Sequence, residues 1–292
     1  MKNWAFLAFA ALLSRYLQAR PPHPDMSAVE QLPEQKLIYH PTRGRTLDPG
    51  SLGLGIKDLY FAAEDKVRLN AWWLPAPPGA PTVLYFHGNG GSLSGMQPTL
   101  TYFHRAGFGA LLVDYRGYGL SQGYPSEAGL QKDARAAYQQ CLKRGVKPQQ
   151  LLIHGQSLGG AVAVQLASEK PCAGLILEST FTSAKDMARR LYGGVAAATL
   201  HTHYCSVTTV ASLKVPVLVM HGDQDSMIPA SMGRALFAAA PQPKEFWMVK
   251  GADHNNLRVL AGPEYVERLR RFYARAKASA FSRSSSRFTS SQ

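Results

Sequence analysis

The sequence predicts an α/β fold in which a mostly parallel central sheet carries helices on both faces. Two observations lead to this prediction: short apolar segments recur along the chain, and stretches with helical patterning separate them. The apolar segments span residues 82–86, 108–114, 151–154, 174–177, 215–220 and 246–249. Strands buried on both faces read as continuous apolar runs, and their alternation with helices is typical of parallel sheets.

The remaining elements complete this pattern. Residues 56–65 and 67–74 have strand patterning around a Glu-Asp-Lys turn, which indicates an antiparallel hairpin at one edge of the sheet. The expected helices span about 95–106, 127–144, 157–169, 230–239 and 263–277. We expect one domain over residues 56–278, preceded by a Pro-rich linker at 21–55. The serine-rich segment 279–292 is predicted to be a disordered tail.

The charge balance indicates which class of binding partner the sequence favours. The 292 residues include 32 Lys and Arg against 19 Asp and Glu, a net charge of +13. Such a field favours anionic partners, among them an anionic membrane surface. No basic block interleaved with aromatic residues and no nucleic-acid motif is present, so we expect no nucleic-acid partner.

The three cysteines indicate neither a disulfide framework nor a zinc site, because no Cys-x-x-Cys or Cys/His ligand spacing occurs. Cys141, Cys172 and Cys205 are predicted to be small buried hydrophobic residues. The run His-Thr-His-Tyr-Cys at 201–205 lacks a fourth ligand and a helical i, i+4 pair. We therefore expect no metal and no cofactor.

The N-terminal segment is treated apart from the fold. After Lys2, residues 4–13 are all apolar, and Arg15 and Arg20 follow. Ten apolar residues are too few to span a bilayer, for which about 20 are needed. Residues 1–20 therefore predict a hydrophobic membrane anchor, or a secretory signal segment. Membrane association is the expected location; a secreted or periplasmic protein and a cytoplasmic one are the alternatives.

A candidate nucleophile lies in the string GQSLG at 155–159. This string directly follows an apolar strand and directly precedes a helix, which is the context that gives a GxSxG pattern its meaning. The sharp turn lifts the hydroxyl of Ser157 clear of the sheet, and Gly155 and Gly159 avoid a collision within it. Gly160 is expected to let the helix pack close to the strands.

A serine hydroxyl needs a base, and the base needs an orienting carboxylate. Of the nine histidines, His254 alone lies in a turn-rich loop after the last strand, whereas His154 and His221 lie within or at the end of apolar strands. The loop after 215–220 offers two carboxylates. Asp223 is close to the strand and is expected to tie its own turn, so Asp225 is the predicted orienting residue.

Backbone N–H groups must stabilise the oxyanion that forms on an attacked carbonyl. The N–H of Leu158 follows the serine at the start of a helix. The glycine-rich string HGNGG at 87–91 follows another apolar strand and lets backbone approach a ligand closely. The N–H of Asn89 is therefore the second predicted oxyanion donor.

At this point the sequence resembles the α/β-hydrolase superfamily and, within it, the Bem46-like group of serine hydrolases. The resemblance covers about 56–277 and rests on five strings in order: YFHGNGG (85–91), DYRGYG (114–119), GQSLG (155–159), HGDQD (221–225) and GADH (251–254). It implies an α/β-hydrolase fold and a Ser-His-Asp triad, and it agrees with Asp225. The second string looks structural in the family, and we assign it no chemistry.

These features predict a serine hydrolase that cleaves a carboxylic ester or thioester through an acyl-enzyme. Residues 181–214 lie where the superfamily inserts lids and are expected to form a small cap, with short helices over 184–200 and a hinge at Gly193 and Gly194. The expected substrate is a small-molecule or lipid-like acyl ester. The alternatives are a peptidase and a catalytically silent hydrolase scaffold used for binding.

Overall fold

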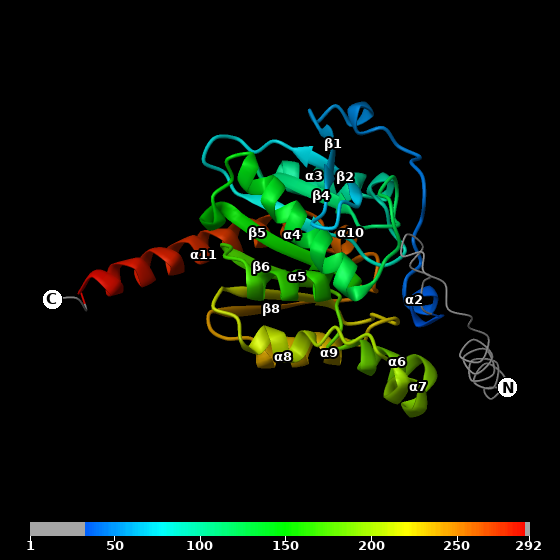
Figure 1. The fold of residues 1–292 in the computed structure, drawn as a ribbon. Coiled ribbons are helices and arrows are strands. Elements are labelled where there is room, and N and C mark those ends of the chain that lie inside the picture. Colours follow the sequence, from blue (N-terminus) through cyan, green and yellow to red (C-terminus); the bar gives the residue numbers. More distant parts are fainter. Residues whose placement is uncertain (1–32, 290–292) are drawn as a thin grey trace.

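The sheet is the organising element of the molecule. The computed structural model describes residues 33–289, and its eight strands form one sheet in the order β1-β2-β4-β3-β5-β6-β7-β8 (Figure 1). The strands are β1 (Lys57–Ala62), β2 (Arg68–Leu74), β3 (Thr82–Phe86), β4 (Gly109–Asp114), β5 (Leu151–Gln156), β6 (Gly174–Glu178), β7 (Val217–Gly222) and β8 (Lys244–Val249). β2 pairs antiparallel with β1 and β4, and every other neighbouring pair is parallel. The predicted parallel sheet with an antiparallel edge is confirmed.

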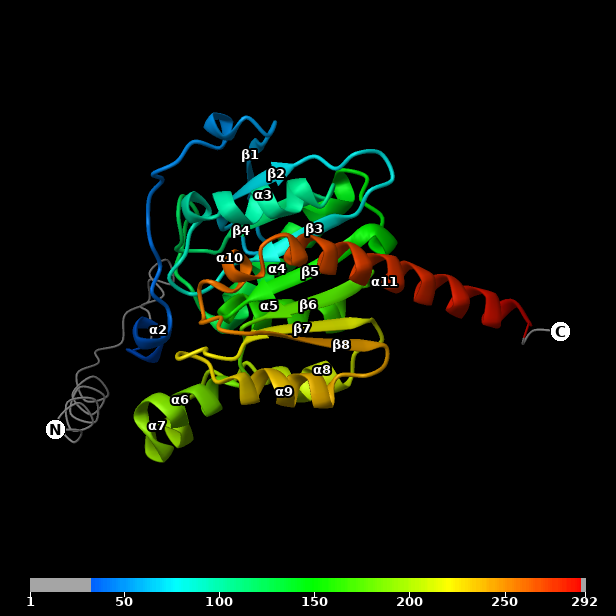
Figure 2. The ribbon, with the colours of Figure 1, turned by 180° about the vertical axis from the view of Figure 1, so that it is seen from behind.

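Helices cover both faces of the sheet, and a few further helices lie at its carboxyl end. They are α2 (Pro33–Ile38), α3 (Gln97–Arg105), α4 (Glu127–Lys143), α5 (Leu158–Glu169), α6 (Ala184–Tyr192), α7 (Gly194–Thr199), α8 (Ser206–Ala211), α9 (Ala230–Ala239), α10 (Leu257–Ala261) and α11 (Pro263–Thr289), with short 3₁₀ turns at Pro49–Leu52, Leu93–Gly95 and Pro148–Gln150. α4, α5, α8 and α9 cover one face, and α3 and α11 cover the other (Figures 1 and 2).

Strand β3 shows why the central strands are apolar throughout. Its alternate side chains point to opposite faces. Leu84 and Phe86 pack with the residues of α4 and α5, whereas Val83 and Tyr85 pack with those of α3 and α11. All five residues of β3 are buried. Because both faces are covered, neither set of side chains can be polar without losing its contact with water.

Two cap helices stand at the carboxyl end of β6. Ser183 caps α6 by accepting a hydrogen bond from the N–H of Asp186 at 3.0 Å. Gly193, at φ 91°, separates α6 from α7, so short helices lie over the predicted stretch 184–200. The rest of the predicted cap region differs: α8 packs against α5 and α9 and belongs to the helical layer.

Residues 33–55, the described part of the predicted linker, contact the domain that follows. Tyr39 is buried, and its hydroxyl lies 2.7 Å from that of Tyr204. Arg45 donates to the carboxylate of Asp58 at 2.7 Å. These contacts hold the described part of the predicted linker on the domain.

The C-terminal prediction also differs from the structure. Helix α11 runs to Thr289 and so includes most of the segment predicted to be a disordered tail. Elongation of an existing helix adds one hydrogen bond per ordered residue, and serine lowers helix propensity only modestly. The N-terminal segment 1–20 lies outside the described residues. Within residues 33–289, none of the helices combines the length and the apolar character needed to cross a bilayer.

Candidate active site

Ser157 lies at the sharp turn between β5 and α5. Its backbone has φ 53° and ψ −120°, a conformation that a non-glycine residue adopts only when its surroundings impose it. A Cβ atom on Gly155 would lie 2.1 Å from the carbonyl oxygen of Gly159, and one on Gly159 would lie 2.1 Å from that of Phe86. Both predicted glycines therefore have a steric cause: a side chain on Gly155 would collide with the backbone of the turn itself, and one on Gly159 would collide with the end of β3.

Gly160, the third glycine near the serine, also has a steric cause. A Cβ atom on Gly160 would lie 2.3 Å from the hydroxyl oxygen of Thr180, so glycine lets α5 approach the end of β6. The same hydroxyl donates a hydrogen bond to the carbonyl of Ser157 at 2.6 Å. The N–H of Ser157 donates to the carbonyl of Glu178 at 2.9 Å. A backbone bond to the end of β6 and a side-chain bond from Thr180 just after it thus hold the strained residue in place.

The three predicted residues from three different loops meet at the carboxyl end of the sheet. The Oγ atom of Ser157 lies 3.1 Å from Nε2 of His254, and Nδ1 of His254 lies 2.9 Å from Oδ2 of Asp225. All three residues are buried. A carboxylate only accepts hydrogen bonds, so Nδ1 carries the proton and Nε2 is left to accept the serine proton.

The carboxylate of Asp225 contacts two backbone N–H groups and two histidines. Its Oδ1 accepts from the N–H of Met227 at 3.1 Å and of Ile228 at 2.7 Å, and its Oδ2 lies 3.3 Å from Nε2 of His221. Burial alone would raise the pKa of this carboxyl, but the hydrogen bonds from His221, His254 and Ile228 outweigh burial and hold the pKa well below its usual range. Asp225 is therefore ionised at neutral pH.

Two other aspartates in the loops after β7 and β8, Asp223 and Asp253, make hydrogen bonds to the backbone of these loops. Asp223 accepts from the N–H of Gly251 at 2.6 Å, so it joins the loops after β7 and β8, whereas we expected it to tie its own turn. Asp253 accepts from the N–H of Ser226 at 2.8 Å and of His254 at 2.7 Å. Both aspartates hold the two loops that carry Asp225 and His254.

The loop with the predicted oxyanion donor packs directly on the nucleophile. A Cβ atom on Gly88 would lie 3.4 Å from the Cβ of Ser157. The side-chain oxygen of Asn89 accepts from the hydroxyl of Tyr118 at 2.8 Å and from the N–H of His40 at 3.0 Å. Tyr115 donates to the carbonyl of His87 at 2.9 Å. The other predicted donor, the N–H of Leu158, is the first of α5, a position without an intrahelical acceptor.

Sequence reasoning missed this use of Tyr115 and Tyr118. They belong to the string DYRGYG, to which we assigned no chemistry, and both are buried beside the loop at 87–91. His87, also buried, packs against both, with its ring centroid 4.5 Å from Tyr115 and 5.3 Å from Tyr118. The string is thus structural in a specific sense, because it supports the loop over Ser157.

A buried polar cluster lies behind the serine turn. Arg258 of α10 pairs with Glu178 at the end of β6 at 3.0 Å, and it donates to the hydroxyl of Tyr85 at 2.6 Å. His154, predicted to be a packing residue, is buried but also lies 3.1 Å from the Glu178 carboxylate. Burial would raise the pKa of Glu178, yet Arg258 and His154 lower it to about 2. The sequence contained no spacing pattern that predicts this cluster.

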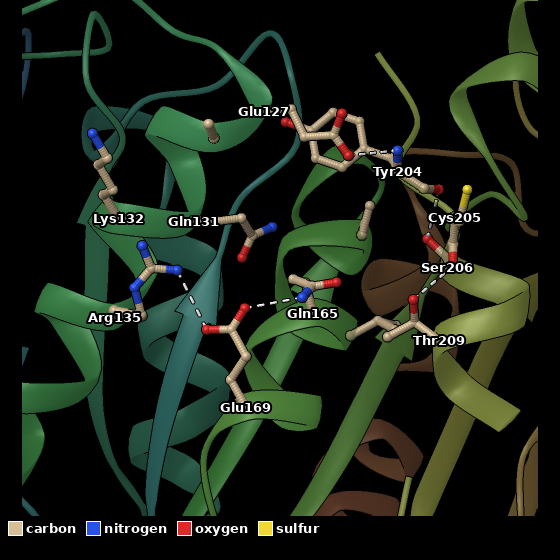
Figure 3. Close-up of a pocket in the computed structure, with 13 residues that line it drawn as sticks. Glu127, Gln131, Lys132, Arg135, Gln165, Glu169, Tyr204, Cys205, Ser206 and Thr209 are labelled. Carbon is tan, nitrogen blue, oxygen red and sulfur yellow. Dashed lines mark hydrogen bonds and ion pairs between the residues drawn. The ribbon is translucent and has the colours of Figure 1, made fainter. Parts of the chain in front are cut away.

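A separate cavity of about 260 Å³ lies between α4, α5 and residues 204–209, and none of Ser157, Asp225 and His254 lines it (Figure 3). Charged groups at its wall pair with one another: Arg135 donates to Glu169 at 3.3 Å.

Cys205 lines the cavity and is exposed, so its prediction as a buried residue is wrong, whereas Cys141 is buried. His201 and Thr202, which precede Cys205 in the sequence, form hydrogen bonds with Glu34 of α2.

No group of three or more His, Cys, Asp or Glu side chains suited to a metal ion occurs within residues 33–289. The described site offers a serine hydroxyl that contacts an imidazole, and an ionised carboxylate that contacts the other nitrogen of the same imidazole. This set is suited to acyl transfer.

Comparison with known proteins places this geometry in context. A family model described as serine aminopeptidase, S33, matches residues 78–209. An uncharacterised protein of Mycobacterium tuberculosis is 37% identical over 243 residues, which cover 82% of this chain and 86% of that protein. The α/β-hydrolase domain-containing protein WAV2 of Arabidopsis thaliana is 32% identical over 232 residues, which cover 71% of this chain and 75% of that protein.

Solved structures show the same fold. The Pyrococcus furiosus esterase Pf2001 has a TM-score of 0.67 and 22% identity, covering 82% of this chain and 98% of its own. A puromycin-hydrolyzing peptidase of Mycobacterium tuberculosis has a TM-score of 0.63 and 18% identity, covering 76% of this chain and 39% of its own. Taken with the sequence relatives, these likenesses show that the chain belongs to the α/β-hydrolase superfamily.

Proposed function

We propose that the protein is a serine hydrolase that cleaves a carboxylic ester or thioester through an acyl-enzyme. The proposal rests on one observation: the unbroken chain of contacts from Ser157 Oγ to His254 Nε2 and from His254 Nδ1 to the Asp225 carboxylate. A serine nucleophile of this kind forms a covalent ester with the acyl group of its substrate. Within the superfamily, the five sequence strings favour the Bem46-like group.

The proposed reaction has two halves. His254 Nε2 takes the proton of Ser157 as Oγ bonds to the substrate carbonyl carbon, and the N–H groups of Leu158 and Asn89 stabilise the oxyanion. The intermediate then expels the alcohol or thiol, which receives the proton from His254. In the second half, His254 takes a proton from water as the water oxygen bonds to the acyl carbon. The intermediate then expels Oγ of Ser157, which takes the proton back from His254, and the carboxylic acid is released.

A peptidase is the second candidate. Two findings favour it: the matching family model is described as a serine aminopeptidase, and a puromycin-hydrolyzing peptidase has the same fold. The same residues would form the acyl-enzyme, with an amine in place of the alcohol as leaving group. A catalytically silent scaffold is the non-enzymatic alternative, and it would have no need for a strained serine in contact with a histidine.

Labelling with a fluorophosphonate probe tests the nucleophile. The probe should label the wild type and fail to label Ser157→Ala. Ser179→Ala is a matched control, because Ser179 also ends a parallel strand at positive φ (46°) and its buried hydroxyl has no hydrogen-bond partner. Equal labelling of wild type and Ser157→Ala would rule out the proposal. Rates with p-nitrophenyl esters, acyl-thioesters and aminoacyl amides then separate esterase, thioesterase and peptidase.

We also propose that residues 1–20 attach the protein to a membrane surface. Lys2, Arg15 and Arg20 flank the ten apolar residues 4–13, and positive charge near an anionic leaflet adds to apolar burial. The segment precedes α2, which Glu34 joins to the cap region through hydrogen bonds to His201 and Thr202.

A further inference from the structure

The large exposed hydrophobic side chains are distributed unevenly over the molecule. Those described are Tyr60, Leu120, Tyr124, Leu191, Tyr192, Val195, Met227, Val259 and Leu260. Apart from Tyr60 in β1, each lies in a connection that follows the carboxyl end of a parallel strand: two after β4, three after β6, one after β7 and two after β8. The carboxyl ends of parallel strands share one edge of the sheet, and Ser157 lies at that edge.

We call these eight residues the apolar rim. Single exposed hydrophobic residues are ordinary on protein surfaces, but a grouping on one face marks an interaction site. The cap part of the rim stands well clear of the domain, since Tyr192 and Val195 are each 61% exposed. The cap helices α6 and α7, helix α10 and helix α2 all lie at the same end of the molecule in both views (Figures 1 and 2).

Helix α6 of the cap is hydrogen bonded to the loop that follows β7. The guanidinium of Arg190 donates to the carbonyl of Ser226 at 3.1 Å and to that of Met227 at 3.4 Å. These two residues directly follow Asp225. The apolar tip formed by Leu191, Tyr192 and Val195 is therefore held beside the loop that carries the carboxylate.

Basic groups accompany the rim. Arg189 is exposed on α6, where it forms a surface ion pair with Asp186 at 2.8 Å, whereas Arg190 of the same helix donates only to backbone carbonyls. Lys36 is exposed on α2, and Arg43 lies over the ring of Tyr124, 5.7 Å from its centroid. With a net charge of +13, these groups favour an anionic apolar surface over a neutral one.

From this arrangement we infer that the apolar rim docks on an anionic lipid bilayer, so that the carboxyl edge of the sheet, where Ser157 lies, faces the membrane. Two properties favour a bilayer as the occupant: exposed basic side chains on α2 and α6 accompany the exposed apolar ones, and α2, the first described element after the apolar residues 4–13, lies at the same end of the molecule (Figures 1 and 2). Together with the proposed function, on which this step rests, docking presents the site with acyl esters of membrane lipids.

A nitroxide label at the rim measures docking directly in the full chain. Cys172→Ala and Cys205→Ser remove the accessible thiols, and Val195→Cys or Tyr60→Cys introduces the label site. Tyr60 is the matched control, since it is exposed and apolar but lies off the rim. With vesicles of phosphatidylcholine and phosphatidylglycerol, we expect the label at 195 to lose access to a water-soluble relaxant and gain access to oxygen, while the label at 60 stays aqueous.

A partition measurement complements the label. The full chain with Leu191→Ser, Tyr192→Ser and Val195→Ser should bind the anionic vesicles roughly tenfold or more weakly than wild type. Tyr60→Ser should bind as wild type does, and vesicles of phosphatidylcholine alone should bind less. Ser157→Ala should also bind as wild type does, so that loss of hydrolysis and loss of docking are distinguished.

The overturning results are equally specific. If protein pelleted with vesicles leaves the label at 195 as aqueous as the label at 60, the rim takes no part in attachment. If the label at 195 becomes shielded without vesicles, at concentrations where the chain elutes as a dimer, the rim binds a second copy instead. Either result ends the inference, whatever the outcome of fluorophosphonate labelling.

Discussion

Glu178 accepts the N–H of Ser157 on its main-chain carbonyl at 2.9 Å, while its carboxylate pairs with the guanidinium of Arg258 at 3.0 Å. One residue at the end of β6 therefore contacts both the strained serine turn and the helix that follows the His254 loop. Arg258 also donates to the side chain of Gln156, the residue before Ser157, at 3.3 Å. The buried pair thus fixes the separation of two loops whose side chains must meet.

Breaking this pair should cost stability. Removal of one partner of a buried ion pair leaves the other charge uncompensated, at about 3–5 kcal/mol. Arg258→Gln and Glu178→Gln should each lower the free energy of unfolding by about that amount, and the double variant by less than their sum. Urea denaturation followed by circular dichroism measures all three. Arg189→Gln, which breaks an exposed pair with Asp186, should change stability by less than about 1 kcal/mol.

Acid stability should depend on the same pair. The folded-state pKa of Glu178 is about 2, below the value of about 4.3 for an unfolded glutamate. A depressed carboxyl pKa contributes stability above the unfolded value, and this contribution is lost as pH falls toward the folded value. Because Arg258 is the main favourable charge that lowers the Glu178 pKa, Arg258→Gln should move the midpoint of acid unfolding to higher pH. An unchanged midpoint would mean that the pair contributes no pH-dependent stability.

The choice between the two aspartates after β7 is tested by paired substitutions. Asp225→Asn should keep the fold but favour the wrong imidazole tautomer of His254, with a loss in kcat as large as about 10⁴ by analogy with other triads. Asp223→Asn weakens only a hydrogen bond from the N–H of Gly251 and should cost far less. Steady-state kinetics on one ester separates them. A reversal of the two effects would make Asp223 the orienting carboxylate.

The support of the oxyanion loop gives a prediction for Tyr118. Tyr118→Phe removes the hydrogen bond to the side-chain oxygen of Asn89 and leaves the buried ring in place. Since loss of one oxyanion donor costs about 10²–10³ in kcat, a displaced donor should cost part of that, about tenfold, with KM little changed. Tyr124→Phe, at an exposed tyrosine, is the control. A change in KM alone would show that the loop binds substrate without stabilising the oxyanion.

Much of the fold was predictable because burial on both faces leaves an unmistakable apolar pattern in β3 to β7. Ser157, Asp225 and His254 were predictable for a related reason. Ser157 and Asp225 follow the buried strands β5 and β7, and His254 follows the edge strand β8, so all three lie at the carboxyl ends of parallel strands, where side chains from distant loops converge. The supporting contacts were not. Arg258 and Glu178 are 80 positions apart, and Tyr39 and Tyr204 are 165 apart. Composition marks none of these residues, because only the three-dimensional packing brings them together.

The position of the protein in the cell is the last prediction. Ten apolar residues behind Lys2 can enter a membrane interface without crossing it, and Arg15 and Arg20 can bind anionic lipid headgroups. In cells that express the full chain, we expect the protein to pellet with membranes and to resist a high-salt wash. A chain that starts at Met26 keeps the apolar rim but lacks the segment, so salt should release it, because screening weakens attraction between exposed charges. Two results would contradict anchoring. Both forms soluble and uncleaved would indicate a cytoplasmic protein, and a shortened form outside the cytoplasm would indicate that residues 1–20 are a cleaved signal segment.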